Sequence, residues 1–220
     1  MKFFSFWRSQ ASFRVRIALN LKGLPAEVIF VDLDTDAHRA DAFRRVNPQM
    51  ALPALVEDDG TTLFQSLAII EYLDETHPSP PLLPNDARGR ARVRALALMV
   101  ACEGHPLLVP RVRRYLDHEL NLRDTQQASW RRHWTVETMA ALEGHLAGHK
   151  DTGRFCHGDA PTLADICLAG HGTVAVMQQI DLSPYPTVKR IFETAMAMPA
   201  FATAHPLMQP DTPEAVRAKK

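Results

Sequence analysis

Three features of the sequence could together bind an anion or an extended peptide. Ser9 lies in the turn between the first predicted strand and the first predicted helix, close to a helix N-terminus. Ser66 begins another predicted helix, where a hydroxyl and unpaired main-chain N–H groups form a ready site for a carboxylate. Pro53 opens a predicted edge strand and leaves neighbouring main-chain groups available to pair with a peptide. Taken singly, each has a simpler explanation: a loop residue, a helix cap and a structural turn.

Other common catalytic motifs are absent from the sequence. There is no GxSxG, no Walker A loop, no HExxH and no GxGxxG after a predicted strand. The ten histidines are dispersed without the spacing of metal ligands. His145 and His149 are four residues apart, but no third ligand accompanies them, so we interpret both as surface histidines. We therefore expect no metal site.

The first part of the chain mixes strand and helix patterns. Strands are predicted over 2–7, 26–33, 52–56 and 61–64, and helices over 12–21, 37–46 and 66–73. The turn at Asp58-Asp59-Gly60 joins the last two strands as a hairpin. Between 12 and 21 the alternation of apolar residues also fits a strand, but Ser12 as a cap and Gly23 as a stop favour a helix. The predicted order is β-α-β-α-β-β-α.

A proline-rich linker, 77–84, separates this α/β unit from a part in which no strand is predicted. Helical patterns cover about 86–118, 124–148, 163–179 and 185–198. Pro106 and Pro110 are expected to kink the first helix, and the capping-box spacing of Thr162 and Asp165 predicts the start of the third. The last ten residues are polar and are expected to fray. We predict a small α/β domain at 1–80 and an all-helical domain at 85–220.

The composition is that of a globular protein in a reducing compartment. Hydrophobic residues make up 46%, charged residues 23%, and the formal net charge is zero. The neutral charge argues against non-specific nucleic-acid binding, which needs a basic surface. Cys102, Cys156 and Cys167 form no CxxC pair, so no disulfide framework is expected. No run of about 18 apolar residues and no signal-peptide cleavage site are present, so we expect no membrane span and a cytoplasmic protein.

Several stretches give the sequence a specific resemblance to a known family. They are RSQASFRVRIALNLKG from Arg8 to Gly23, Asn47-Pro48 before Leu52-Pro53-Ala54-Leu55, QSLAIIEYL from Gln65, and GDAPTLAD from Gly158. Together they resemble the zeta-class glutathione transferases, which include maleylacetoacetate and maleylpyruvate isomerases, over nearly the whole chain. The resemblance implies a fold of the α/β plus all-α class. A thioredoxin-like domain that binds glutathione would precede an α-helical glutathione-transferase domain that forms the substrate pocket.

The resemblance also implies roles for individual residues. Ser9 matches the serine whose hydroxyl stabilises the thiolate of glutathione, which serves as the cofactor. Leu52, before a proline expected to be cis at Pro53, would pair its main chain with the cysteinyl part of the tripeptide. Gln65 and Ser66 would hold the γ-glutamyl carboxylate and amine. The remaining implied positions are His38, Gln49 and His105 for the glycyl end or the side of the peptide, and Arg8 and Arg111 for the carboxylates of the substrate.

The implied chemistry depends on keeping a thiol ionised. A free thiol has a pKa of about 8.5, so little of it is thiolate at neutral pH. A hydroxyl donor and a helix N-terminus favour the charged form. The thiolate could add to the activated double bond of a maleyl compound, and rotation followed by expulsion of glutathione would give the fumaryl isomer. Arginines would neutralise the carboxylates and the developing enolate.

Departures from the family pattern keep other activities open. Ala11 stands where many members of the class have a cysteine, which rules out a protein thiol there. Leu108 and Val109 replace a frequent pair of asparagines, and no arginine occurs from Val174 to Met177. We predict a glutathione-dependent cis–trans isomerase of maleylacetoacetate or maleylpyruvate. The alternatives are a glutathione S-transferase or peroxidase acting on apolar electrophiles, and a non-catalytic interaction module with the same fold. A homodimer is expected from the resemblance.

Overall fold

The computed structural model describes residues 1–217, and the chain divides into two compact units. The first unit contains Met1–Leu82 together with the segment from Ala197 onward, and the second contains Leu83–Met196. The first boundary falls within the predicted linker. The segment from Ala197 groups with the first unit and not with the helical domain predicted for 85–220, because its short helix α9 (Pro199–Ala202) packs against α1 (Gln10–Lys22).

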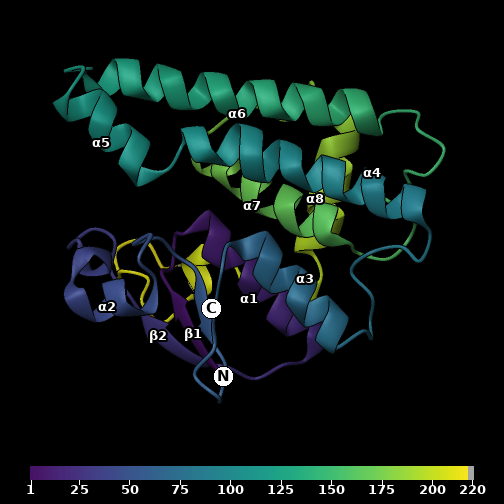
Figure 1. Ribbon diagram of the computed structural model, residues 1–220. Helices are drawn as coiled ribbons and strands as arrows, with labels where there is room; N and C mark the ends of the chain where they lie inside the picture. The colour runs from purple at the N-terminus through teal and green to yellow at the C-terminus, as the bar shows by residue number, and fades with distance from the viewer. Residues whose placement is uncertain (218–220) are drawn as a thin grey trace. The chain divides into compact units, whose positions relative to one another are not determined.

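The first unit is built on a four-stranded sheet in the order β2-β1-β3-β4. Figure 1 labels the two parallel strands, β1 and β2. The strands are β1 (Lys2–Ser5), β2 (Glu27–Phe30), β3 (Ala54–Val56) and β4 (Thr62–Phe64). Strand β1 runs parallel to β2 and antiparallel to β3, and β3 runs antiparallel to β4. With the helices between them, this order confirms the predicted thioredoxin-like β-α-β-α-β-β-α arrangement and the predicted hairpin.

Helix α1 begins three residues earlier than predicted. Its N-cap is Ser9, whose Oγ accepts a hydrogen bond from the Ser12 N–H at 3.2 Å, so the prediction of Ser12 as the cap is wrong. Gly23 ends the helix as predicted, with φ of 64°, a left-handed conformation that glycine adopts without steric cost. Almost every residue of α1 is buried, which explains why its apolar pattern resembled a strand as well as a helix.

The helix predicted over 37–46 is two elements. A 3₁₀ turn, η1 (Ala37–Arg39), is followed by an extended residue, Ala40, and then by α2 (Asp41–Val46). Phe43 of α2 is buried and packs its ring 5.7 Å from that of Phe4 on β1. This aromatic contact anchors α2 to the sheet.

The second unit contains no strand among the described residues. Its helices are α4 (Ala87–Leu98), α5 (Pro110–His118), α6 (Asp124–Leu146), α7 (Leu163–Met177) and α8 (Pro186–Met196), with a π-helical turn η2 (Met99–Gly104) and a 3₁₀ turn η3 (His105–Leu107) after α4. The predicted helix over 86–118 is therefore interrupted around Pro106 and Pro110, as the prolines indicated. Asp165 Oδ2 accepts the Thr162 N–H at 2.8 Å, which confirms the predicted capping box at the start of α7.

One segment of the second unit is long and apolar enough, by length and composition alone, to cross a membrane, although the sequence predicted no span. Within Ala87–His118, an 18-residue window has a mean hydropathy of 1.3, and 28% of that window is buried inside the protein. Length and composition alone do not assign a membrane span, and this segment is broken by a π turn and two prolines. The window therefore carries no assignment to a membrane.

The end of the described chain is anchored in part. Helix α3 (Ser66–Thr76) lies beside α1, and the chain after α9 continues through a 3₁₀ turn, η4 (Pro206–Met208), to Arg217. Thr212 is buried, with its Oγ1 donating to the Pro206 carbonyl at 2.6 Å. The predicted fraying of the last ten residues is wrong for this part, and residues 218–220 lie outside the described residues.

Candidate active site

The strand register brings Ser9, Pro53 and Ser66 to one edge of the sheet, the edge at which β1 and β4 end and β3 begins. Phe4 near the end of β1 pairs with Ala54 at the start of β3, and Ala54 also pairs with Phe64 at the end of β4. The chain that leaves β1 leads to Ser9, the chain that enters β3 contains Pro53, and the chain that leaves β4 leads to Ser66. Because antiparallel neighbours exchange ends, these connections leave the sheet on the same side.

Ser9 occupies the N-cap of α1 at this edge. Its side chain is half-buried, its N–H donates to the Phe6 carbonyl at 3.1 Å, and its carbonyl accepts from Phe13 N at 2.8 Å. The Oγ already accepts the Ser12 N–H, so its own hydrogen is available for an outside acceptor. The first N–H groups of α1 point the same way as in any helix, toward its N-terminus, and favour an anion there.

Gln65 and Ser66 form the start of α3. Gln65, with φ of 68°, holds the N-cap position, and Ser66 is the first helical residue, so the prediction that Ser66 itself caps the helix is wrong. Ser66 is buried, and its Oγ accepts a hydrogen bond from Arg14 Nη1 at 3.1 Å. The arginine thus places a positive charge behind the serine, beside the positive end of a helix.

The segment before β3 has the conformation expected from the resemblance. The peptide bond between Leu52 and Pro53 is cis. Strand β3 lies between β1 and β4, so the prediction that Pro53 opens an edge strand is wrong. Leu52 and Pro53 nevertheless precede the first ladder pair at Ala54, and within residues 1–217 no hydrogen bond uses the Leu52 main chain. A peptide could therefore still pair with it.

Gln49 joins this group through its side chain. Its Oε1 accepts a hydrogen bond from Gln65 Nε2 at 2.9 Å, and both side chains are exposed. The turn that carries Gln49 is fixed by buried Asn47, whose Oδ1 accepts the Gln49 N–H at 3.1 Å and whose Nδ2 donates to the Ala51 carbonyl at 2.7 Å. The asparagine of the Asn47-Pro48 motif therefore shapes the loop between Gln49 and Leu52.

The other two predicted residues of the first unit have different neighbours. His38 is buried in η1, with Nε2 3.8 Å from Asp36 Oδ1. Arg8 is exposed, pairs with Asp34, and lies with its guanidinium carbon 5.7 Å from the centre of the Trp7 ring. The roles of both residues in binding glutathione or substrate stay predictions.

The remaining predicted residues belong to the second unit. His105 begins η3, and Arg111 is the second residue of α5, where its side chain is exposed. Leu108 and Val109 lie between these two elements and are half-buried. Val176 and Met177 at the end of α7 are 54% and 49% exposed.

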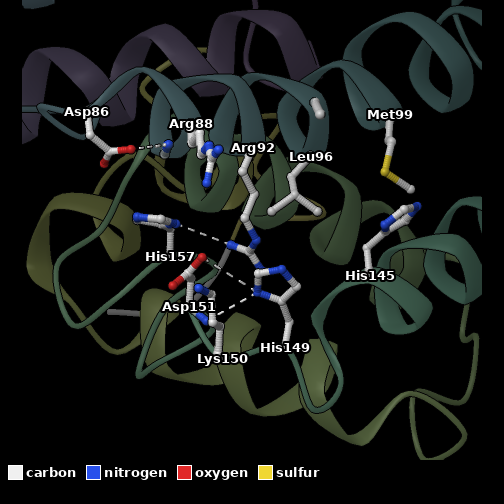
Figure 2. Close-up of a pocket in the computed structure, with 12 residues that line it drawn as sticks. Asp86, Arg88, Arg92, Leu96, Met99, His145, His149, Lys150, Asp151 and His157 are labelled. Carbon is white, nitrogen blue, oxygen red and sulfur yellow. Dashed lines mark hydrogen bonds and ion pairs between the residues drawn. The ribbon is translucent and has the colours of Figure 1, made fainter.

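A cavity of about 680 Å³ also opens in the second unit (Figure 2). Basic side chains line it, namely Arg88, Arg92, His145, His149, Lys150 and His157. Arg92 is engaged inside the protein, where it donates to the Cys156 carbonyl and to Thr152 Oγ1, and Asp86 Oδ1 caps α4 by accepting the Gly89 N–H at 2.8 Å. No residue predicted to bind glutathione or substrate lines this cavity, and we assign it no catalytic role.

Sequence reasoning missed Arg14 and Arg16, two buried arginines of α1. Arg14 is 2% exposed and supports Ser66, whereas Arg16 is 7% exposed and donates to the carbonyls of Phe6 and Trp7, just before Ser9. Arginines are mostly exposed in proteins, so composition alone gave no reason to place them inside. Their position among the apolar residues of the most family-specific stretch was the available signal.

Comparisons with known proteins identify the family. Residues 8–76 match the family model for the glutathione S-transferase N-terminal domain. A maleylpyruvate isomerase from Ralstonia sp. is 43% identical, and the alignment covers 96% of this chain and all of that protein.

Solved structures extend the likeness to the whole fold. A maleylacetoacetate isomerase from Methylobacterium extorquens AM1 with bound malonate and glutathione has a TM-score of 0.94 and 47% identity, with 97% of this chain and all of that chain covered. A maleylpyruvate isomerase described as a bacterial glutathione S-transferase of the zeta class has a TM-score of 0.93 and 43% identity, with the same coverage. With its thioredoxin-like sheet edge, its serine-capped α1 and a likeness that spans the full chain, the protein belongs to the zeta-class glutathione transferases.

Proposed function

We propose that the protein is a glutathione-dependent cis–trans isomerase of maleylacetoacetate or maleylpyruvate. The observation that carries the proposal is the convergence of Ser9, Leu52–Pro53 and Gln65–Ser66 at one edge of the sheet, where α1 and α3 both begin. Two helix N-termini at one edge favour an anionic ligand, and an unbonded main chain at Leu52 favours an extended peptide. Glutathione combines both properties, and relatives that are solved with it share this fold.

The residues at the edge fit the parts of glutathione as its cofactor. Gln65 and Ser66 would hold the γ-glutamyl end, Leu52 would pair with the cysteinyl main chain, and Ser9 would direct its hydroxyl hydrogen to the sulfur. Gln49, bonded to Gln65, would approach the peptide from the side, and His38 and His105 remain candidates for its glycyl end.

Catalysis in this proposal depends on charge. Bound glutathione supplies a thiolate that adds reversibly to the activated double bond, which allows rotation before it is expelled. Ser9 and the N-terminus of α1 lower the cost of keeping that sulfur ionised at neutral pH. Arg8 and Arg111 would neutralise the carboxylates of the substrate, and the malonate in the Methylobacterium relative is itself a dicarboxylate.

The test is the substitution Ser9→Ala in an assay of glutathione-dependent isomerisation followed by absorbance. We expect kcat to fall roughly a hundredfold because one donor to a developing or stabilised anion is lost. The KM for glutathione should stay nearly constant, since the peptide is held by other residues. A Ser9→Thr variant, which keeps a hydroxyl, should retain much of the rate. An unchanged rate in Ser9→Ala would remove Ser9 from the mechanism.

A second candidate is conjugation or peroxide reduction on an apolar electrophile. The observation that favours it is the apolar character of Leu108 and Val109 and the exposure of Val176 and Met177, where polar side chains would suit a dicarboxylate better. A panel with maleylpyruvate, maleylacetoacetate, an aryl halide and an organic hydroperoxide separates the two. Turnover of the last two alone would favour this candidate.

The third candidate, a non-catalytic interaction module, predicts no turnover on the whole panel. The presence of Ser9, Pro53, Gln65 and Ser66 together argues against it. We also propose a cytoplasmic homodimer that binds no nucleic acid, as the family likeness and the neutral net charge suggest. Sedimentation at several concentrations measures the oligomeric state directly.

A further inference from the structure

The loop that leads into Ser9 is bound by side chains from other parts of the chain. Phe6 and Trp7, which join β1 to the Ser9 turn, are both buried, and the Ser9 N–H donates to the Phe6 carbonyl at 3.1 Å. The position of Ser9 therefore depends on the two peptide groups on either side of Trp7. Both of these groups are bound by side chains outside the loop, namely Arg16 of α1 and Asp211.

Arg16 binds carbonyl groups of this loop. Its Nη1 donates to Ser5 Oγ at 3.1 Å and to the Phe6 carbonyl at 3.3 Å, and its Nη2 donates to the Trp7 carbonyl at 2.9 Å. Its Nε donates to the Ala204 carbonyl at 2.9 Å. Burial lowers the pKa of Arg16 to about 9, so the guanidinium is still charged at neutral pH. One side chain thus ties the loop to the C-terminal segment, residues 199–217.

Asp211 binds a main-chain N–H group of the same loop. Its Oδ2 accepts the Trp7 N–H at 2.8 Å, across 204 residues of sequence. Its Oδ1 is buried and has no hydrogen-bond partner among the described residues. The positive charge of Arg16 lies close enough to attract this carboxylate. Removing Asp211 would leave a buried N–H of the loop without its acceptor.

The C-terminal segment is itself ordered by internal hydrogen bonds. Gln209 Nε2 donates to the carbonyls of Thr203 and His205 at 3.0 and 2.9 Å, and Thr212 Oγ1 donates to the Pro206 carbonyl. Asn20 on α1 donates to the Ala200 carbonyl at 2.9 Å, which fastens the segment to the helix that Ser9 caps. The acceptors for Arg16 and Trp7 are therefore held in place.

We infer that Asp211 is a positioning residue, through which the C-terminal segment fixes the loop before Ser9 and sets the direction of the Ser9 hydroxyl. The inference rests on the proposed function, because it assigns Asp211 an effect on the thiolate that Ser9 stabilises. A hydroxyl that is displaced by a fraction of an ångström donates a weaker hydrogen bond to sulfur, and catalytic groups tolerate little displacement.

The test compares Asp211→Ala with Asp211→Asn. For Asp211→Ala we expect kcat to fall about tenfold, which is about 1.4 kcal/mol of barrier. The pKa of the bound glutathione thiol, followed by ultraviolet thiolate absorbance against pH, should rise by about one unit, while the KM for glutathione stays within about twofold. Asp211→Asn keeps an oxygen that can accept the Trp7 N–H and should restore most of both values. If Asp211→Ala does not fold, Asp211→Glu, which misplaces the carboxylate, takes its place with the same expectation.

A double variant tells whether Asp211 acts through Ser9. If it does, adding Asp211→Ala to Ser9→Ala should lower kcat no further, whereas multiplying effects would overturn the inference. Unchanged kcat and thiol pKa in Asp211→Ala would also overturn it, even if Ser9→Ala is inactive. An unaffected Ser9→Ala would instead contradict the proposed function. Glu214→Ala, an exposed carboxylate of the same segment, is the matched control and should behave as the unmodified protein.

Discussion

Ser9 and Ser66 share one arrangement: the oxygen of each hydroxyl accepts a hydrogen bond from inside the protein. The donors are Ser12 N at 3.2 Å and Arg14 Nη1 at 3.1 Å. A serine hydroxyl has a single hydrogen, and with a donor already behind its oxygen that hydrogen is directed toward another acceptor. In the proposed function these acceptors are the thiolate at Ser9 and the γ-glutamyl carboxylate at Ser66.

The substitution Ser66→Ala should therefore lower the affinity for glutathione more than it lowers kcat. We expect the KM for glutathione to rise about tenfold, because a hydrogen bond to a charged group contributes roughly 1.5–3 kcal/mol, while kcat changes little. Steady-state kinetics at varied glutathione measures both. Ser129→Ala, an exposed serine of α6, is the control. A fall in kcat at constant KM would contradict the division of roles between the two serines.

The serines of the site could be predicted from the sequence, whereas the arginines that support them could not. A serine beside a predicted helix start has few roles, and both serines do lie at helix starts. Arg14 and Arg16 occupy core positions because their charges meet a serine oxygen and main-chain carbonyls. Those acceptors come from the loop after β1, from α3 and from the C-terminal segment, and no periodicity within α1 reveals them.

At the scale of elements, two helices of the second unit, α4 and α7, each have an aspartate that accepts main-chain N–H groups near the helix start, but the two aspartates have different surroundings. Asp165 is fully buried and accepts the N–H groups of Cys156 and Thr162 at 2.7 and 2.8 Å, besides the Thr162 hydroxyl. Asp86 is exposed, and its Oδ1 accepts the Gly89 N–H. Water can take the place of Asp86 as an acceptor, but it has no access to the buried N–H groups that Asp165 accepts.

We predict that Asp165→Ala destabilises the protein by about 3 kcal/mol, because it leaves buried donors without an acceptor. Asp86→Ala should have a clearly smaller effect, since water can satisfy the Gly89 N–H. Urea unfolding followed by circular dichroism measures the free energy of unfolding of both variants. Equal losses would show that burial does not decide the contribution of these caps.

Element boundaries followed from local chemistry only where that chemistry was unambiguous. Gly23 and the hairpin turn at Asp58-Asp59-Gly60 were predicted correctly, because a left-handed residue and a two-strand turn leave local signals. The start of α1 was misplaced because Ser9 and Ser12 are both suitable caps, and the Ser12 N–H turned out to be the donor. The break at Ala40 had no such signal.

The whole molecule should respond to acid through His205, which lies in the C-terminal segment just before η4. Desolvation and, less strongly, Arg16 lower the pKa of His205. The unfolded chain therefore takes up this proton at a higher pH than the folded protein, so stability is lost as pH falls below about 6.5, the ordinary value. In the folded protein, neutral His205 accepts the Leu207 N–H on Nδ1 at 3.2 Å.

Urea unfolding from pH 8 to pH 5 tests this sign against a His205→Asn variant, whose side chain can still accept the Leu207 N–H. We expect the variant to lose less stability than the unmodified protein below about pH 6.5. Identical slopes for the two proteins would exclude His205 as a source of the acid sensitivity.

The sequence allowed the α/β class of the first unit, the helical second unit and the family to be predicted. It did not indicate that the segment from Ala197 onward groups with the first unit. Helical patterns report which face of a helix is buried but not which partner covers it. The polar character of residues 211–217 concealed two anchors, Asp211 and Thr212, because each is fixed by hydrogen bonds and not by apolar contact.

The split first unit has a consequence for synthesis of the chain on the ribosome. Residues 1–82 are translated well before the Ala204 carbonyl that Arg16 binds and the Asp211 carboxylate that Trp7 binds. At a typical elongation rate of about 5–20 residues per second, the nascent sheet waits several seconds for them. A transcript that stops before residue 199 would thus release a protein with both bundle and sheet, but with the Trp7 N–H of the Ser9 loop lacking its acceptor.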